Sequence, residues 1–302
     1  MIFVIIYISA DGRRDFMVGY IDVGGGMRGV YGAGVLDRFL DDDIKFSCYI
    51  GVSAGSANIV SHLGGHRERT LRFYRDHSYH REYMGLNNLI KKGSYINLDY
   101  IYSTLTDEGG LDPLNYDVFK ENNADFYIVA TDSATGKACY FDRSHIKRNE
   151  CTVIKASCSV PLACPPRNYN GTLYFDGGVA DPIPVRKAIE LGCDKVVVTL
   201  TLPKDFQKNH KFPRWLYPMV IKKYPKIAPM LYDMIDKYNS DLEYLRLLEK
   251  QGKALILSPD DCCGVTMLKR SKEGIQKLYQ KGYEDACRVK EFLSFQENVS
   301  EK

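Results

Sequence analysis

Short apolar runs alternate with helical patterns through the first two thirds of the chain. β-rich runs predict strands at 16–23, 46–52, 125–130, 139–142, 173–175 and 195–200. Helical spacing or helix-ending signals predict helices at 30–40, 67–77, 99–105 and 182–191. Because strands separated by helices pair in parallel, the order predicts a three-layer α/β sandwich, a mainly parallel central sheet flanked by helices.

The last third has a different pattern. Residues 212–250 are rich in aromatic, methionine and basic side chains, interrupted by Pro218, Pro225 and Pro229. One interpretation is a lid or peripheral membrane contact through 212–238; the other, which we favour, is a set of helices that pack their aromatic side on the core. A strand at 254–257 and a final helix near 268–295 complete the pattern, and Asp112-Pro113 predicts a further helix start.

No repeat or Gly/Ser linker separates these regions. We therefore expect one structural unit, with a catalytic core at 16–204 and a mainly helical extension at 205–302 packed on it. The apolar run at 2–8 is too short for a membrane span and lacks the basic flank of a signal peptide, and Met17 is an alternative start to Met1.

Composition excludes some classes of function. The net charge of +3, from 41 basic and 38 acidic side chains, is too balanced for a nucleic-acid-binding protein. The nine cysteines show neither a disulfide framework nor a metal-ligand spacing, so we expect reduced thiols in a cytoplasmic protein with no metal and no cofactor.

A glycine loop follows the first predicted strand. The run Gly24-Gly25-Gly26-Met27-Arg28-Gly29 matches the dinucleotide-binding pattern G-x-G-x-x-G. That site needs an acidic residue at the end of the next strand, but this strand ends in 47–51 without one. A phosphate loop is also excluded, since no Lys-Ser/Thr pair follows the glycines.

A candidate nucleophile follows the second predicted strand. Gly51-Val52-Ser53-Ala54-Gly55 matches G-x-S-x-G between a strand and a helix, the setting of a nucleophile elbow. The alternative is a tight turn with a capping serine. Because parallel neighbouring strands end at one edge of a sheet, the glycine loop lies beside this serine, and its amides suit a tetrahedral oxyanion.

The candidate base is a carboxylate. Asp176-Gly177-Gly178 follows a short strand, and only His210 lies downstream of it, in the charged loop 204–211 that we expect to be solvated. The five upstream histidines lie in polar surroundings and are expected at the surface: His62, His66, His77, His80 and His145. An aspartate acting directly on the serine is the simplest remaining choice, provided that burial raises its pKa above about 3.9.

These three motifs, in this order, resemble the patatin-like phospholipase family, whose members use a Ser–Asp dyad. Ala156-Ser157 with Pro161, and Thr131-Asp132 with Gly136, resemble further family segments, and the similarity covers about 18–200. It implies Ser53 as nucleophile, Asp176 as dyad acid, Gly51 and Gly55 as elbow glycines, and an oxyanion loop of Gly24, Gly25, Gly26, Arg28 and Gly29. The role of Arg28 stays open between positioning the loop, meeting a phosphate head group and a surface ion pair.

The resemblance implies hydrolysis of (phospho)lipid carboxylic esters through an acyl-enzyme. The catalytic motifs permit two alternatives: a soluble esterase or thioesterase of short acyl groups, and a non-catalytic lipid-binding protein of the same fold. The partner is then a lipid or ester substrate rather than nucleic acid, and the location is cytoplasmic or peripheral at a membrane.

Overall fold

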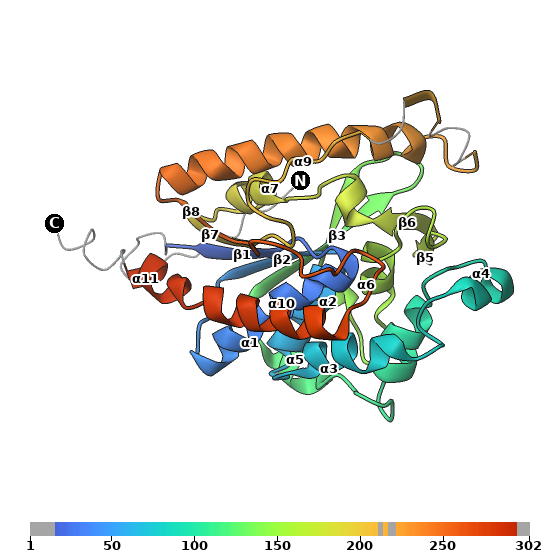
Figure 1. The fold of residues 1–302 in the computed structure, drawn as a ribbon, viewed down its shortest axis with the longest axis horizontal. Helices are drawn as coiled ribbons and strands as arrows, with labels where there is room; N and C mark the ends of the chain where they lie inside the picture. Colours follow the sequence, from blue (N-terminus) through green and yellow to red (C-terminus); the bar gives the residue numbers. More distant parts are fainter. Residues whose placement is uncertain (1–15, 211–213, 217–221, 295–302) are drawn as a thin grey trace.

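In the computed structural model, which describes residues 16–210, 214–216 and 222–294, eight strands form one central sheet (Figure 1). Their bounds are β1 Val18–Asp22, β2 Cys48–Val52, β3 Asp125–Asp132, β4 Ala138–Asp142, β5 Arg167–Tyr169, β6 Thr172–Asp176, β7 Lys195–Thr199 and β8 Ala254–Leu257. Strands β3, β2, β1, β7 and β8 are parallel neighbours, whereas β4, β5 and β6 pair antiparallel. The predicted mainly parallel sheet is confirmed.

Helices cover both faces of this sheet (Figure 1). α1 (Val30–Asp41), α2 (Ala54–Leu63) and α10 (Lys272–Asp285) lie on one face, and α7 (Val185–Glu190) and α9 (Ile227–Lys250) lie on the other. α1 and α10 touch backbone to backbone, because a Cβ at Gly34 or Gly282 would clash with a carbonyl of the other helix. The predicted three-layer sandwich is therefore confirmed, and α10 is built into one outer layer.

The remaining helices are short. They are α3 Arg69–Arg75, α4 Leu86–Lys92, α5 Tyr116–Glu121, α6 Thr152–Ser157 and α11 Arg288–Ser294, with a π-helical segment at Tyr100–Leu105. Within the described ranges, no helix has both the length and the apolar character needed to cross a bilayer.

Three predicted helix boundaries were wrong. Asp112-Pro113 starts no helix, because the Asp112 carboxylate accepts hydrogen bonds from Arg72, and α5 is capped instead by Asn115. α7 begins at Val185 after Pro184 rather than at 182. The final helical stretch is two helices, α10 and α11, separated at residues 286–287.

The aromatic stretch at 212–250 is only partly within the described residues, since 211–213 and 217–221 lie outside them. Its described part contains the long helix α9, which buries Ile227, Ile235 and Tyr238 among other side chains. The interpretation that aromatic side chains pack on the core therefore holds for α9. Trp215 differs, because 67% of it is exposed.

Two strands meet end to end along β3. Residues 127–129 of β3 pair with β2 on one side and with β4 on the other. Residues 130 and 131 pair with β6 in place of β2, and still with β4. β2 and β6 therefore occupy the same side of β3 and run toward each other. The last residue of β2, Val52, pairs with Val129, and the last residue of β6, Asp176, pairs with Ala130.

Candidate active site

Ser53 occupies a strained turn between β2 and α2. Its φ and ψ are 54° and −129°, a conformation that side chains rarely adopt. The flanking glycines allow it: a Cβ at Gly51 would clash with the Ser56 backbone, and a Cβ at Gly55 would clash with the Asp22 carbonyl. The predicted elbow glycines thus stand where the chain has no room for a side chain, and the serine is held at the sheet edge.

Ser157 ties this turn to the sheet. The Ser53 amide donates to Ser157 Oγ at 2.9 Å, and that hydroxyl donates to the Val129 carbonyl at 2.6 Å. The Ser56 hydroxyl donates to the Ser53 carbonyl at 2.6 Å. Both backbone polar groups of Ser53 are therefore bound, and the elbow is fixed against β3.

Asp176 faces Ser53 across the junction of β2 and β6. Its side chain is 7% exposed and accepts from the Gly178 amide at 2.8 Å. Burial raises the pKa of Asp176 to about 6, although hydrogen bonding to the Ser53 side chain and the Gly178 amide acts in the opposite direction. In the described residues, no hydrogen bond joins a histidine to either Ser53 or Asp176.

The glycine loop lies next to the elbow in a conformation that only glycine adopts readily. The φ angles of Gly24, Gly25 and Gly26 are 63°, 121° and 62°. The Gly24 amide donates to Asp22 at 2.9 Å. Within the described part of the chain, the amides of Gly25 and Gly26 have no protein partner, so both are available as hydrogen-bond donors to a ligand.

The other two loop residues have different surroundings. Gly29 allows close packing, since a Cβ there would clash with the Tyr74 hydroxyl. The Arg28 guanidinium lies alongside Gly25, with Nη2 at 3.3 Å from the position that a Cβ would take there, and it lines the cleft outside Ser53.

A buried Asp22–Asn58 pair supports the loop from below. Asp22 is fully buried at the end of β1, and Asn58 Nδ2 donates at 2.9 Å both to Asp22 and to the Gly29 carbonyl. Burial raises the pKa of Asp22 to about 6. This pair joins β1, the glycine loop and α2, and it was not predicted from the sequence, where neither residue belongs to a motif.

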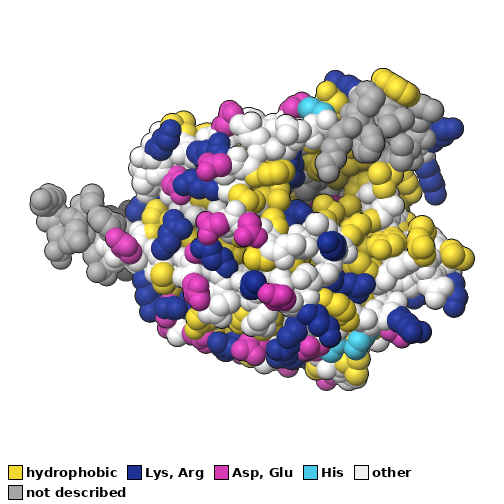
Figure 2. Space-filling model, viewed as in Figure 1, with side chains coloured by type: hydrophobic (Ala, Val, Ile, Leu, Met, Phe, Trp, Pro, Cys, Tyr) yellow, Lys and Arg dark blue, Asp and Glu magenta, His cyan; other side chains and the backbone are white. Residues whose placement is uncertain are grey.

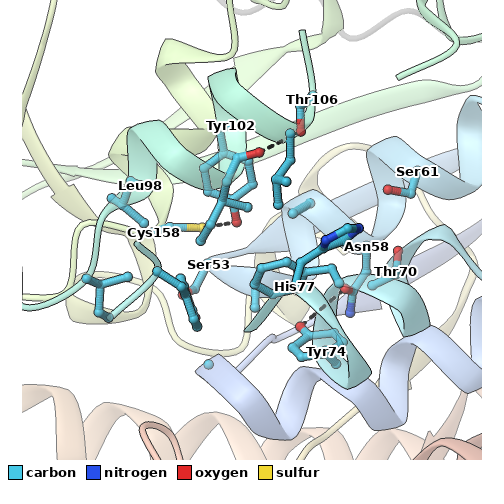
Figure 3. Close-up of a pocket in the computed structure, with 18 of the residues that line it drawn as sticks. Ser53, Asn58, Ser61, Thr70, Tyr74, His77, Leu98, Tyr102, Thr106 and Cys158 are labelled. Carbon is cyan, nitrogen blue, oxygen red and sulfur yellow. Dashed lines mark hydrogen bonds between the residues drawn. The ribbon is translucent and has the colours of Figure 1, made fainter. Parts of the chain in front are cut away.

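A narrow apolar channel opens at Ser53 and follows α2 (Figure 3). Its volume is about 80 Å³, and most of its wall is formed by aromatic and aliphatic side chains such as Phe73, Leu98, Ile101 and Leu105. One face of α2 lines the remaining side with small and polar residues. They form a single stripe along the helix: Ala54, Ala57, Asn58 and Ser61.

Polar groups close the far end of the channel. Arg69 donates to Ser61 Oγ at 2.8 Å and to Thr106 Oγ1 at 2.9 Å. Ser61 follows Ser53 by eight residues, so at a rise of about 1.5 Å per residue the channel extends roughly 12 Å along the helix. The channel therefore ends where its apolar wall meets the Arg69 guanidinium.

A wider cleft opens on the other side of Ser53, with a volume of about 540 Å³. Figure 2 shows hydrophobic side chains gathered around a hollow in the right half of the view. The cleft contains both dyad residues and the glycine loop, and it is also lined by Lys208, Met234, Ile235, Tyr238 and Met267. The extension thus contributes side chains to the wall around the candidate nucleophile.

The comparisons with known proteins agree with this arrangement. A family model described as "Patatin-like phospholipase" matches residues 23–189, which run from the residue after β1 into α7 and contain the elbow, the glycine loop and Asp176. The chain belongs to the patatin-like phospholipase family. A second model, "Domain of unknown function (DUF6363)", matches residues 224–295, which include α9 and α10.

Two relatives illustrate the family's range. "Uncharacterized protein YjjU" of Escherichia coli (strain K12) is 29% identical over 215 residues, which are 67% of this chain and 59% of that protein. "Probable lipid hydrolase 463L" of Invertebrate iridescent virus 6 is 26% identical over 262 residues, which are 75% of this chain and 83% of the relative. The chain therefore spans less than two thirds of the length of YjjU.

A solved structure, "Crystal structure of VipD from Legionella pneumophila", is similar over 94% of this chain and 69% of that one. The identity is 14% and the TM-score 0.49.

One prediction about the surroundings of this patatin-like site was wrong. His62 was expected at the surface, but it is 7% exposed and burial lowers its pKa to about 4. The predicted exposure of the loop after β7 holds for residues 204–207, 209 and 210. Lys208 differs from these neighbours: it is half-buried and lines the cleft, where Tyr238 and Asn239 of α9 hold it.

Proposed function

We propose that this patatin-like protein hydrolyses lipid carboxylic esters, with Ser53 as nucleophile and Asp176 as its base. The observation that carries the proposal is the meeting of β2 and β6 along β3, which brings a strained serine and a buried carboxylate together at the junction of an apolar channel and a wide cleft. Family membership supports the same activity.

In the first half of the cycle, Asp176 takes the hydroxyl proton as Ser53 Oγ attacks the ester carbonyl carbon. A pKa of about 6 makes Asp176 a stronger base than an ordinary aspartate, yet it remains ionised at neutral pH. The bond to the leaving alcohol then breaks, and the alcohol takes the proton back from Asp176. In the second half, water loses a proton to the same carboxylate and attacks the acyl-enzyme carbonyl. The bond to Ser53 Oγ then breaks, Ser53 takes the proton back from Asp176, and the fatty acid is released.

The oxyanion is stabilised by the amides of Gly25 and Gly26, whose N–H groups have no other protein partner in the described residues. Each such donor typically contributes about 10²- to 10³-fold in rate. Because Thr201 Oγ1 donates to the Gly24 carbonyl, and the Met27 amide donates to the Met267 carbonyl at 3.0 Å, the loop is anchored on both sides before substrate binds.

The channel along α2 holds the acyl chain, because an alkyl chain gains from leaving water for an apolar wall and the channel starts at the nucleophile. The cleft then receives the alcohol part of the ester. Its rim carries exposed apolar side chains, with Leu162 63% and Phe206 44% exposed, which suits a substrate presented at a lipid surface. These features favour a lipid over a short soluble ester.

Labelling with a fluorophosphonate probe tests the nucleophile. Wild type is expected to react and Ser53→Ala is not; absence of labelling in folded wild type would support a non-catalytic lipid-binding protein instead. Turnover of phospholipid vesicles compared with a monomeric short-chain ester then separates the lipid hydrolase from the soluble esterase.

Asp176→Asn tests the base. We expect a loss of roughly 10⁴-fold or more in kcat, as is common when a catalytic partner of a nucleophile is removed, with the fold retained by circular dichroism. Asp181→Asn is a matched control, because Asp181 is also buried but pairs with Lys237 at 2.9 Å instead of facing Ser53. Wild-type turnover in Asp176→Asn would contradict the dyad.

A further inference from the structure

The cleft beside Ser53 holds two cations that form no ion pair within the described residues. Arg28 and Lys208 both line it, together with Ser53 and Asp176. Within the described residues, neither forms an ion pair with a carboxylate, and Arg28 Nε is buried with no hydrogen-bond partner. Both side chains are half-buried and their like charges repel each other, so the arrangement calls for an explanation.

Lys208 is held in place from both ends. The Asn239 side chain binds its backbone twice, accepting from the Lys208 amide and donating to the Lys208 carbonyl, each at 2.9 Å. The Lys208 ammonium lies 3.9 Å from the centre of the Tyr238 ring, a cation–π contact with a side chain that is 4% exposed. α9 therefore fixes the position of this ammonium instead of leaving it free in solvent.

The negative charge of Asp176 balances the two cations of the site only in part. Burial and the neighbouring Arg28 lower the pKa of Lys208 to about 8, and attraction to Asp176 offsets this only in part. Burial also lowers the pKa of Arg28. An anion bound between the two cations would reverse both effects, because it stabilises their charged forms.

We infer that Lys208, together with Arg28, binds an anionic phosphate group on the alcohol side of the ester, and that Lys208 determines the preference for such substrates. This inference rests on the proposed function and adds the substrate class to it. The channel takes the acyl chain, and the cleft selects a phosphorylated alcohol. Lys208 lies between the two matched family segments, and the α9 side chains that fix it belong to the segment of unknown function, which thereby acquires a part in substrate selection.

Two water-soluble esters with the same acyl chain test the preference: 1-hexanoylglycerol 3-phosphate and 1-hexanoylglycerol. The quantity is the ratio of their kcat/KM values. We expect wild type to favour the phosphorylated ester and Lys208→Met to lower the ratio roughly 10- to 100-fold, the usual loss for a charge-assisted hydrogen bond. Lys208→Arg keeps the charge and should restore most of the ratio.

Lys204→Met is the matched control, since Lys204 lies on the same loop but pairs with Glu249 at 2.7 Å outside the cleft. Its ratio should equal that of wild type. An unchanged ratio in Lys208→Met would overturn the inference.

A binding measurement separates this result from failure of the proposed function. Glycerol 3-phosphate should raise the melting temperature of wild type but not of Lys208→Met, and inorganic phosphate at the same concentration should not. Stabilisation by glycerol 3-phosphate alone identifies a lipid head group as the ligand, and equal stabilisation by inorganic phosphate identifies free phosphate. No stabilisation by either overturns the anion site, whereas failure of fluorophosphonate labelling overturns the hydrolase and leaves this binding result standing.

Discussion

The channel and the cleft both begin at Ser53 but are built differently. The channel is a narrow apolar space whose wall comes almost entirely from the family-matched segment, with Met267 as an addition. The cleft is several times larger, is lined by the two cations Arg28 and Lys208, and takes much of its wall from the loop after β7 and from α9. Under the proposed function, the difference assigns chemistry and acyl-chain binding to one part of the sequence and the choice of alcohol to another.

Among the changes that compare the two spaces, the largest effect is expected where they meet. Gly25→Ala places a side chain at φ 121° and against Thr201 Oγ1, so it displaces a proposed oxyanion donor. We expect kcat/KM to fall about 10²- to 10³-fold for every ester, whatever its chain or head group. Gly171→Ala controls for backbone strain, since it also has a positive φ, 84°, but opens into free space. A loss confined to one class of ester would show that Gly25 does not contribute to a step common to all of them.

The next effect is a pH dependence that distinguishes the base from the cleft. Asp176 must be ionised to accept a proton, so kcat/KM should fall about tenfold per pH unit below 6 and level off above it, for all esters. The phosphate preference should instead decline above pH 8, as Lys208, beside Arg28, Asp176 and Tyr238, loses its proton. Rate profiles of the two hexanoyl esters between pH 4.5 and 9.5 measure both; a single common profile would contradict the separation.

The smallest effect is expected at the far end of the channel. Leu105→Trp fills part of the apolar wall next to Thr106, so long acyl chains should lose several-fold in kcat/KM while short chains change little. Ile90→Trp is the control, because Ile90 is 81% exposed on α4. Comparing dodecanoyl with butanoyl esters of p-nitrophenol gives the ratio. An equal loss for both chain lengths would place the acyl chain elsewhere.

Sequence patterns predicted the parts of this site that depend on local backbone geometry. The elbow around Ser53 and the glycine run required small residues beside strands, and parallel order then placed both at one sheet edge. Burial was also anticipated to raise the pKa of Asp176, and it does. The antiparallel approach of β6 was not predictable from that order, so Asp176 was inferred by elimination and by family resemblance.

Contacts between distant segments could not be predicted. Ser157 was noticed only as part of a family-like stretch. Its hydroxyl links the amide of Ser53, 104 positions earlier in the sequence, to the carbonyl of Val129 in β3, 28 positions earlier. Lys208 looked solvated because its sequence neighbours are polar, whereas its enclosing partners Tyr238 and Asn239 follow some 30 residues later. The local sequence of this charged loop does not show that α9 partly covers the side chain of Lys208.

The end-to-end meeting of β2 and β6 has a consequence for engineering. The candidate nucleophile and its proposed base are spaced by consecutive backbone pairings on one strand, Val52 with Val129 and Asp176 with Ala130, and not by the loops that line the cleft. Those loops can therefore be exchanged or redesigned while the spacing is kept. The alcohol selectivity can then be changed by redesigning residues 201–209 and the facing turns of α9. The reaction centre itself stays in place during such a redesign.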